Sequence, residues 1–169
     1  MKDLEIRKAD SSDLDKIVEM QLSLQEHLEN SNPLIWRYTK EKKELLKRDL
    51  ENQFMDENHL ILVAEVKGEI VGFVHAEVQH RTTHIPAIIG SIANIFVHKN
   101  FRRKGIGSRL IQEVYRFFRT KNVKDVYLRY VLGNKEGEKF WEKLGFKPIL
   151  VTAHSQVDMV EKRILSTIR

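Results

Sequence analysis

Cysteine is absent from this chain of 169 residues. That absence excludes disulfide bonds, zinc sites with cysteine ligands and a thiol nucleophile, and it fits a reducing compartment. The N-terminus has no apolar run of signal-peptide length, and charged residues interrupt every hydrophobic stretch before it reaches the length of a membrane-spanning helix. We therefore expect a cytoplasmic protein without a membrane partner and without a metal.

The composition is that of a folded globular domain, with 41% hydrophobic and 31% charged residues. A chain of this length buries roughly 70% of the surface that its unfolded form exposes, so it can support its own core. No repeat, low-complexity stretch or linker divides it, and residues 1–169 are predicted to form a single domain. The formal charge of +5 slightly favours an anionic ligand. Basic and acidic residues alternate over most of the chain, and no DNA- or RNA-binding motif is visible, which argues against a nucleic-acid partner.

Hydrophobic periodicity alternates along the chain between strand-like and helical stretches. Asp10 or Ser11 is suited to cap the first helix, and Lys67 and Gly68 are typical of a hairpin turn. The order indicates an α/β fold with antiparallel strands early and a strand-helix-strand crossover late. Strands are expected at 4–9, 59–66, 69–79, 88–97 and 123–131 and again after 147, and helices at 10–28, 39–54, 105–121 and 134–146.

A basic, glycine-containing stretch separates the strand that ends at Val97 from the helix that begins near Gly105. The first N–H groups of a helix have no partner within it, and with the helix dipole and Arg102 to Lys104 they suit a diphosphate. Glycine at 105 and at Gly107 permits close approach to the backbone. A P-loop is absent, and Leu110 stands where a dinucleotide fingerprint needs its third glycine. A solvated basic turn is the alternative interpretation.

This stretch resembles the acetyl-CoA loop of the GNAT superfamily, the general-control-related N-acetyltransferases. That loop reads Arg/Gln-x-x-Gly-x-Gly/Ala after a strand ending in apolar-x-Val, here residues 102–107 after Ile95-Phe96-Val97. The segment that starts at Asn134, NKEGEKFWEKLGF, is similar to the family's Asn-x-x-Ala-x-x-Phe-Tyr-x-x-x-Gly-Phe segment. The resemblance covers nearly the whole chain. It implies a mixed, mostly antiparallel central sheet with splayed parallel strands 4 and 5, flanked by about four helices.

The resemblance also implies an activity, the transfer of acetyl from acetyl-CoA to a primary amine by direct attack. A small-molecule amine, a peptide or protein N-terminus and a lysine side chain all stay open as acceptors, and a homodimer is a candidate assembly. Trp36 and Tyr38 could line the acceptor pocket or pack in the core. A catalytically idle acyl-CoA-binding regulatory module is the alternative function.

The cofactor roles follow from the same resemblance. Backbone groups of Ile95 and Val97 would pair with the pantetheine arm as an added strand. Asn134 would bridge the cofactor arm and the next strand, or it would only cap its helix. Lys135 or Lys139 would meet a phosphate or stay solvated. The full set of cofactor-binding candidates is Ile95, Phe96, Val97, Arg102, Arg103, Lys104, Gly105, Ile106, Gly107, Ser108 and Asn134.

The catalytic positions depart from the family pattern. Trp141 stands where the family usually has a tyrosine that acts as general acid. An indole N–H cannot protonate a thiolate at neutral pH. Tyr130 is the nearest phenol and becomes the candidate general acid. Ala93 and Asn94 occupy the region where some relatives carry a glutamate base, so Glu77 on the preceding strand is the candidate base. His75, His80 and His84 are alternatives, because histidine titrates near neutrality.

Overall fold

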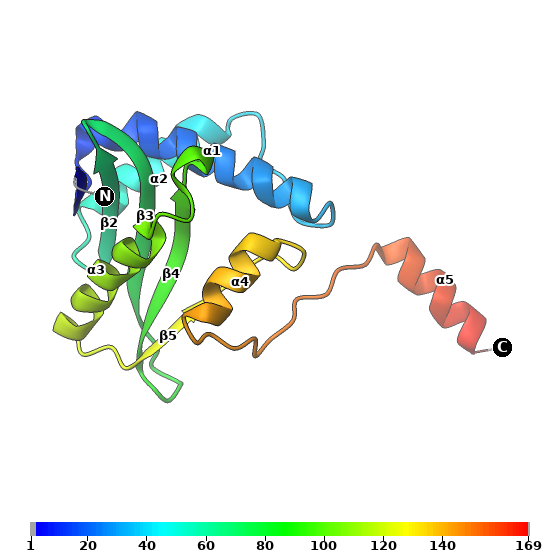
Figure 1. Ribbon diagram of the computed structural model, residues 1–169. Coiled ribbons are helices and arrows are strands. Elements are labelled where there is room, and N and C mark those ends of the chain that lie inside the picture. Colours follow the sequence, from blue (N-terminus) through cyan, green and yellow to red (C-terminus); the bar gives the residue numbers. More distant parts are fainter. Residues whose placement is uncertain (1–2, 169) are drawn as a thin grey trace.

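A five-stranded sheet forms the centre of the computed structural model, which describes residues 3–168 (Figure 1). The strands follow one another in space in chain order, and each neighbouring pair is antiparallel except the last, which is parallel. The predicted α/β fold, mostly antiparallel with parallel strands 4 and 5, is confirmed. The strands are β1 (Leu4–Lys8), β2 (His59–Val66), β3 (Glu69–His80), β4 (Ile88–Val97) and β5 (Asp125–Leu128).

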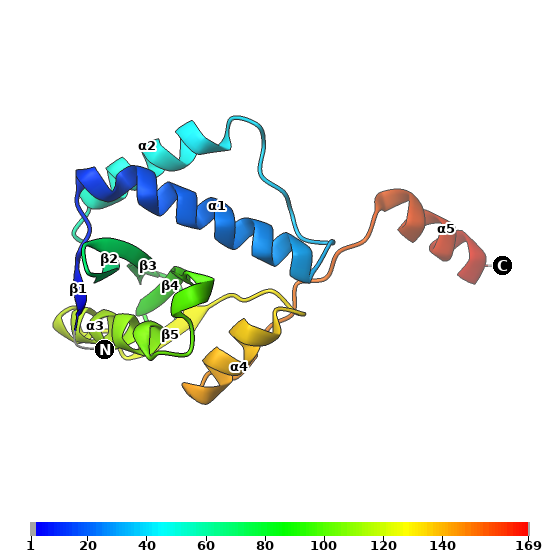
Figure 2. The ribbon, with the colours of Figure 1, turned by 45° about the horizontal axis from the view of Figure 1, so that its top comes forward.

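Helices cover both faces of the sheet. Figure 2 shows α1 and α2 on one face and α3 on the opposite face, with α4 beyond β5. We call these the α1 face and the α3 face. About four helices were expected, and the described residues contain five α-helices and two short 3-10 turns. They are η1 (Ser11–Asp13), α1 (Leu14–Ser31), α2 (Lys42–Phe54), η2 (Lys99–Phe101), α3 (Ile106–Thr120), α4 (Lys135–Lys143) and α5 (Val157–Thr167).

Each face of the sheet has its own apolar core. On the α3 face, the buried side chains of β2, β3 and β4 pack against Leu110, Val114 and Phe118 of α3. On the α1 face, Phe73 and Phe96 pack against side chains of α1 and α2. This follows from the period of two along a strand, which sends neighbouring residues to opposite faces.

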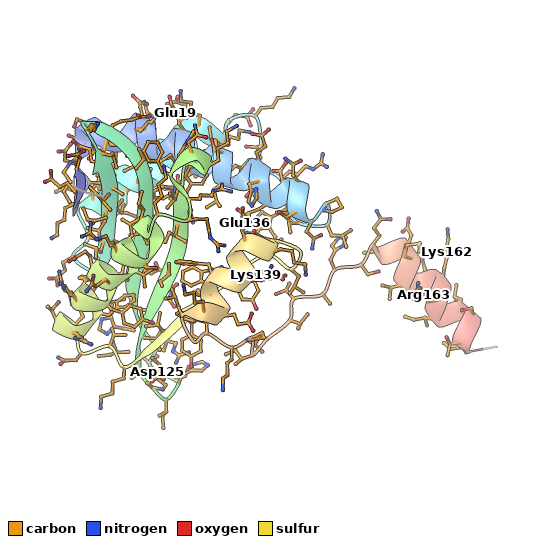
Figure 3. The ribbon with its side chains drawn as sticks, in the orientation of Figure 1. Glu19, Asp125, Glu136, Lys139, Lys162 and Arg163 are labelled. Atoms are coloured by element: carbon orange, nitrogen blue, oxygen red, sulfur yellow. The ribbon has the colours of Figure 1, made fainter. Side chains whose placement is uncertain are left out.

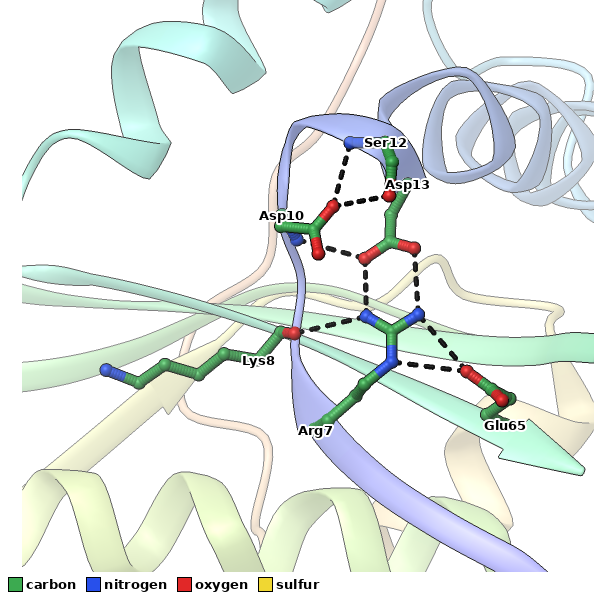
Figure 4. Close-up of polar contacts among 6 residues, drawn as sticks. All are labelled: Arg7, Lys8, Asp10, Ser12, Asp13 and Glu65. Carbon is green, nitrogen blue, oxygen red and sulfur yellow. Dashed lines mark hydrogen bonds and ion pairs between the residues drawn. The ribbon is translucent and has the colours of Figure 1, made fainter. Parts of the chain in front are cut away.

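An ion-pair cluster fixes the start of α1 to the sheet (Figure 4). The Arg7 guanidinium on β1 donates to both oxygens of Asp13 at 2.6 and 2.9 Å, and its Nε donates to Glu65 on β2 at 3.2 Å. Asp13 also accepts the backbone N–H of Asp10, whose own side chain accepts from Ser12, which makes a capping box. Of the two predicted caps, Asp10 is the one present, and it caps η1, the 3-10 turn that leads into α1.

The predicted hairpin is also present. Lys67 and Gly68 connect β2 and β3 with φ angles of +53° and +80°. Two positive φ angles in a two-residue loop are typical of a type I′ turn, whose twist matches that of the strands. Helix α4 ends at Lys143, two residues before Gly145, whose φ of +89° is left-handed and typical of a helix C-terminus.

The prediction of strands after residue 147 was wrong. Residues 147–156 have no regular secondary structure, and residues 157–167 form α5. Val157, Val160, Ile164 and Ile168 follow a helical spacing, whereas an extended segment needs a neighbouring strand to form a sheet. Every residue of 147–168, which we call the C-terminal arm, is exposed. Figure 1 shows α5 standing apart from the body at the end of an extended segment. Of the helices described, none is long and apolar enough to cross a membrane.

Candidate active site

β4 and β5 are paired over a short distance and then separate. The pairing runs from Ile89 opposite Asp125 to Ile92 opposite Leu128. Beyond that point β4 continues for five residues, to Val97, on the side of β3 alone. The strands are thus splayed as predicted, and this part of β4 has an open edge.

A bulge lies where the two strands separate. Asn94 is opposite His75 and Ile92 is opposite Ala76, so Ala93 has no partner on β3. Ala93 is also exposed. A bulge re-aims the neighbouring backbone groups and is common next to active sites.

The open edge of β4 presents backbone groups of Ile95 and Val97. The His98 N–H donates to the Val71 carbonyl of β3 at 2.8 Å. Backbone groups alternate in direction along a strand, so the groups of Ile95 and Val97 point away from β3. The Val97 carbonyl indeed accepts the Arg102 Nε at 3.0 Å on that side. The Phe96 side chain, in contrast, is buried in the core of the α1 face.

The loop after β4 leads into α3 through Gly105, whose φ of +82° is left-handed. No side chain caps the first turn of α3, so its N–H groups lack a side-chain acceptor. The side chain of Ile106 is buried in the core, while Ser108 is exposed. At Gly107 a Cβ would lie 3.2 Å from the Phe140 ring of α4, so packing is a further reason for glycine there.

The three basic residues of the loop have different surroundings. Arg102 contacts the Glu136 carboxylate at 2.5 Å in addition to the Val97 carbonyl, and so ties the end of β4 to α4. Lys104 donates to the Asn100 carbonyl at 3.0 Å. The exposed Arg103 forms no side-chain hydrogen bond or ion pair to another of the described residues. It is therefore the most available of the three for an anion.

Asn134 caps α4, as one of its two predicted roles requires. Its Oδ1 accepts the Gly137 N–H at 3.2 Å and lies 3.3 Å from the Nε2 of His27 on α1. A Cβ at Gly137 would lie 2.8 Å from the Asn134 amide nitrogen, which explains glycine where the family segment has alanine. The cap thereby brings the start of α4 next to the end of α1.

The structure places the two catalytic candidates on opposite faces of the sheet. Glu77 is on the α1 face, in line with Phe73, and its carboxylate accepts from the Gln79 amide. Tyr130 packs against the core of the α3 face. Buried Trp141 packs edge-on against two phenylalanines, so it is a core residue. The cavity beside Tyr130, about 420 Å³, is also lined by Glu138, Glu142, Gly145, Phe146, Lys147 and Pro148.

A histidine pair on the α1 face was missed by the sequence analysis. His59 Nδ1 of β2 lies 2.9 Å from His75 Nε2 of β3. His59 Nε2 lies 3.7 Å from Asp56 Oδ2 and 3.9 Å from Glu77 Oε2. Burial, followed by the nearby His59, lowers the pKa of His75 to about 4. Counting residues back from the Lys67-Gly68 turn would have placed both histidines at the same end of the hairpin. The other candidates, His80 and His84, are exposed near the β3–β4 loop.

Helix α1 adds buried amides on the same face. Gln25 donates to the Trp36 carbonyl at 2.8 Å and to Glu29 at 2.9 Å, which fastens the segment after α1. The Oε1 of buried Gln21 has no hydrogen-bond partner among the described residues. The Trp36 side chain is exposed, whereas burial raises the pKa of Tyr38.

Comparison with known proteins agrees with this geometry. A family model described as the acetyltransferase (GNAT) family matches residues 23–146. An N-alpha-acetyltransferase of Sulfurisphaera tokodaii is 31% identical over 102 residues, which cover 57% of this chain and 61% of that protein. An uncharacterized N-acetyltransferase of Archaeoglobus fulgidus is 30% identical over 142 residues, 82% of this chain and 89% of that protein. The solved structure of the aminoglycoside N-acetyltransferase AAC(6')-Iy in complex with CoA has a TM-score of 0.71 at 18% identity. The match covers 90% of this chain and 93% of that enzyme's chain.

The fold is shared with the solved N-acetyltransferase AAC(6')-Iy. The family model covers more than half of the chain, and the chain belongs to the acetyltransferase (GNAT) family. The predicted family is confirmed, and an acyltransferase is the enzyme class of that family. The chain matches 61% of the length of the Sulfurisphaera relative, and the likeness to the aminoglycoside enzyme concerns the fold.

Proposed function

We propose that this protein transfers acetyl from acetyl-CoA to a primary amine by direct attack of the amine on the thioester. The observation that carries the proposal is the open edge of β4, which runs from the bulge at Ala93 to Val97 and on toward the uncapped first turn of α3. An extended chain bearing amides pairs with such an edge. A diphosphate suits a helix N-terminus with Arg103 and Lys104 beside it. Family membership supports the same chemistry.

The chain's own groups have separate roles in this proposal. Backbone groups of Ile95 and Val97 hold the pantetheine arm, and an N–H of this edge stabilises the oxyanion that forms on the thioester carbonyl. Bound acetyl-CoA supplies the activated acyl group. As the C–N bond forms and the C–S bond breaks, Glu77 is the final acceptor of the amine proton, and Tyr130 protonates the thiolate. Asn134 fixes the start of α4 beside the cofactor arm.

The proposed acceptor is the α-amino group of a peptide or protein. The Sulfurisphaera relative named as an N-alpha-acetyltransferase supports this class. The α1 face next to the bulge offers buried polar groups, among them Gln21 and His75, that suit an amine and its neighbouring amides. Trp36 and Tyr38 lie on the segment that α1 fastens through Gln25, where they would flank an incoming peptide.

A thiol-release assay tests the activity. The protein is incubated with acetyl-CoA and a set of acceptors: a lysine-free peptide with a free N-terminus, an N-blocked peptide with one lysine, neamine and spermidine. Because the chain has no cysteine, a thiol reagent reports released CoA without a protein background. We expect release with the free N-terminus above the other three. Proven CoA binding with no release for any acceptor would contradict the proposal.

Loop variants test where the cofactor binds. Arg103→Ala should raise the KM for acetyl-CoA about tenfold, since a hydrogen bond to a charged group contributes about 1.5–3 kcal/mol. Arg116→Ala, exposed farther along α3, is the matched control and should leave KM unchanged. Equal KM values in the two variants would remove Arg103 from the site.

The second candidate function is a catalytically idle acyl-CoA-binding module. Buried Trp141 at the family's tyrosine position favours it. Tyr130→Phe and Trp141→Tyr separate the two functions. If Tyr130 is the acid, its phenylalanine variant should lose turnover and keep its affinity for CoA. Turnover that first appears in Trp141→Tyr would identify an idle module.

We also propose a homodimer, in the cytoplasm, joined through the C-terminal arm. The arm exposes apolar side chains over residues 147–168, and about 20–30 residues per partner make a standard interface. The outer edge of β5 ends the sheet and is open to an added strand. Figure 3 shows Lys162 and Arg163 on α5, which stands apart from the body. Light scattering should report a dimer for the full chain and a monomer for Val160→Asp/Ile164→Asp. A full chain that is monomeric at micromolar concentration would contradict the homodimer.

A further inference from the structure

The two hydrogen-bonded histidines of the α1 face connect the buried part of that face to solvent. His75 is 5% exposed and lies opposite Asn94, directly beside the bulge at Ala93. His59, at the first residue of β2, is nearer the surface and reaches toward Asp56 and Glu77. The three side chains form a series from His75 through His59 to Glu77. Glu77, the proton acceptor proposed above, is at its outer end. A direct transfer to Glu77 would leave the two imidazoles without a role.

The 2.9 Å contact between His59 Nδ1 and His75 Nε2 constrains the protons on both rings. One of these nitrogens must donate and the other accept, because two neutral imidazoles form one N–H···N bond. If His75 donates, its Nδ1 is unprotonated and is a base. Among residues 3–168, the contact with His59 is the only hydrogen bond of the His75 ring. His59 then carries its proton on Nε2, the atom that lies near the two carboxylates.

We propose that His75 accepts the proton of the attacking amine and that His59 passes it on to Glu77. This inference rests on the acetyl transfer proposed above. The amine nitrogen bonds to the thioester carbon, and its proton moves to His75 Nδ1. The Nε2 proton of His75 moves to His59 Nδ1, and the Nε2 proton of His59 moves to the Glu77 carboxylate. The C–S bond breaks and the thiolate receives a proton from Tyr130, so every proton and electron pair is accounted for.

Burial makes His75 a poor base by itself and a suitable relay. An isolated charge on so buried a ring is strongly disfavoured, and its lowered pKa, about 4, reflects that. A concerted shift exchanges the tautomer of His75 without leaving a charge on it. The last step spans 3.9 Å between His59 Nε2 and Glu77 Oε2, a distance at which a water or a side-chain rotation completes the hydrogen bond.

The charged neighbours of the pair are few. The titratable groups that act on His75 are His59 from β2 and Glu77 from its own strand. Asn94, opposite on β4, and the buried side chains Gln21 and Gln25 of α1 carry no charge. Asp56 acts on His59 from the turn before β2. Within residues 3–168, no group of three or more histidine, aspartate or glutamate side chains is arranged to hold a metal ion. Proton transfer is the chemistry that the arrangement of His75, His59 and Glu77 suits.

Glutamine variants test the relay, because glutamine keeps hydrogen bonds but does not titrate. kcat/KM for the lysine-free peptide is measured from pH 5 to 9 in wild type, His75→Gln, His59→Gln and the control His154→Gln, which is exposed on the C-terminal arm. We expect a loss of about 100-fold for His75→Gln and about tenfold for His59→Gln, within the range of general base catalysis. The KM for acetyl-CoA should not change. Imidazole NMR of the unliganded protein should show the His75 pKa rising in His59→Gln, since His59 lowers it.

The outcomes separate the relay from the proposed function. A wild-type protein that acetylates no amine overturns the proposed function. A wild-type protein that is active, with both glutamine variants within twofold of it at every pH, overturns the relay alone. If His75→Gln does not fold, partly exposed His59→Gln decides: unchanged kcat/KM together with an unchanged His75 pKa contradicts the relay.

Discussion

The two faces of the sheet bury different kinds of side chain. The core of the α3 face consists of apolar residues. The buried polar residues of the described chain are all on or beside the α1 face: Asp13 before α1, Gln21 and Gln25 on α1, and His75 on β3. Burying a polar group costs free energy unless it is paired. We therefore expect the α3 face to contribute most of the stability, and the α1 face, where we propose that the acceptor binds, to contribute less.

The largest expected effect is on the α3 face. The Phe118 ring is 1% exposed and occupies the space that a Cβ at Gly90 of β4 would need. Phe118→Ala should lower the free energy of unfolding by about 3–5 kcal/mol, the range for a buried phenylalanine. Urea denaturation measures it, with exposed Arg116→Ala as a control that should stay within about 0.5 kcal/mol of wild type. A loss below about 1 kcal/mol would show that this core is not the main source of stability.

The next effect tests how closely the same face is packed. A Cβ at Gly90 would lie 2.7 Å from the Phe118 ring. Gly90→Ala should therefore cost about 2 kcal/mol by overpacking. Removing the ring should relieve the strain, so in a Phe118→Leu background the same change should cost much less. Equal costs in both backgrounds would mean that another contact is responsible.

The third effect concerns the ion pair that fixes α1. Arg7 lowers the pKa of buried Asp13 below its unfolded value. The stabilisation is therefore present above the unfolded pKa, about 4, and is lost as pH falls through the folded pKa. Asp13→Asn should cost about 1.5 kcal/mol at pH 7, typical of a hydrogen bond to a charged group. Denaturation at pH 7 and pH 3 should show this difference shrinking in acid. A difference that does not depend on pH would contradict the assignment.

Sequence patterns predicted the parts of the molecule that local rules decide. β4 has the predicted bounds because an apolar run ends there at a turn, and the β2–β3 turn follows from Lys67 and Gly68. The loop before α3 was found because glycine and basic residues stand at fixed spacing. The bulge at Ala93, the role of Arg102 and the His59–His75 contact depend on pairing between strands and on α4. Local periodicity does not contain that information.

The C-terminal arm is a second place where local periodicity was not sufficient to predict the structure. Its apolar residues suggested strands, because residues 149–152 favour an extended conformation. Whether an extended segment becomes a strand depends on a neighbour, and none of the described residues pairs with this one. α5 needs no such neighbour to form its backbone hydrogen bonds, so the helical spacing of residues 157–168 prevailed.

The smallest expected effect on stability is at Gln21, and it tests the difference between the two faces most directly. Its Oε1 is buried and has no hydrogen-bond partner among residues 3–168, so Gln21→Leu should leave stability unchanged or raise it by less than about 1 kcal/mol. The KM for the peptide acceptor should rise, because this oxygen is available to an N–H of the acceptor. Gln25→Leu is the matched control: it loses the bonds to Trp36 and Glu29 and should cost about 1–2 kcal/mol. If Gln21→Leu destabilises the protein as much as Gln25→Leu does, the polar groups of the α1 face are structural rather than reserved for a ligand.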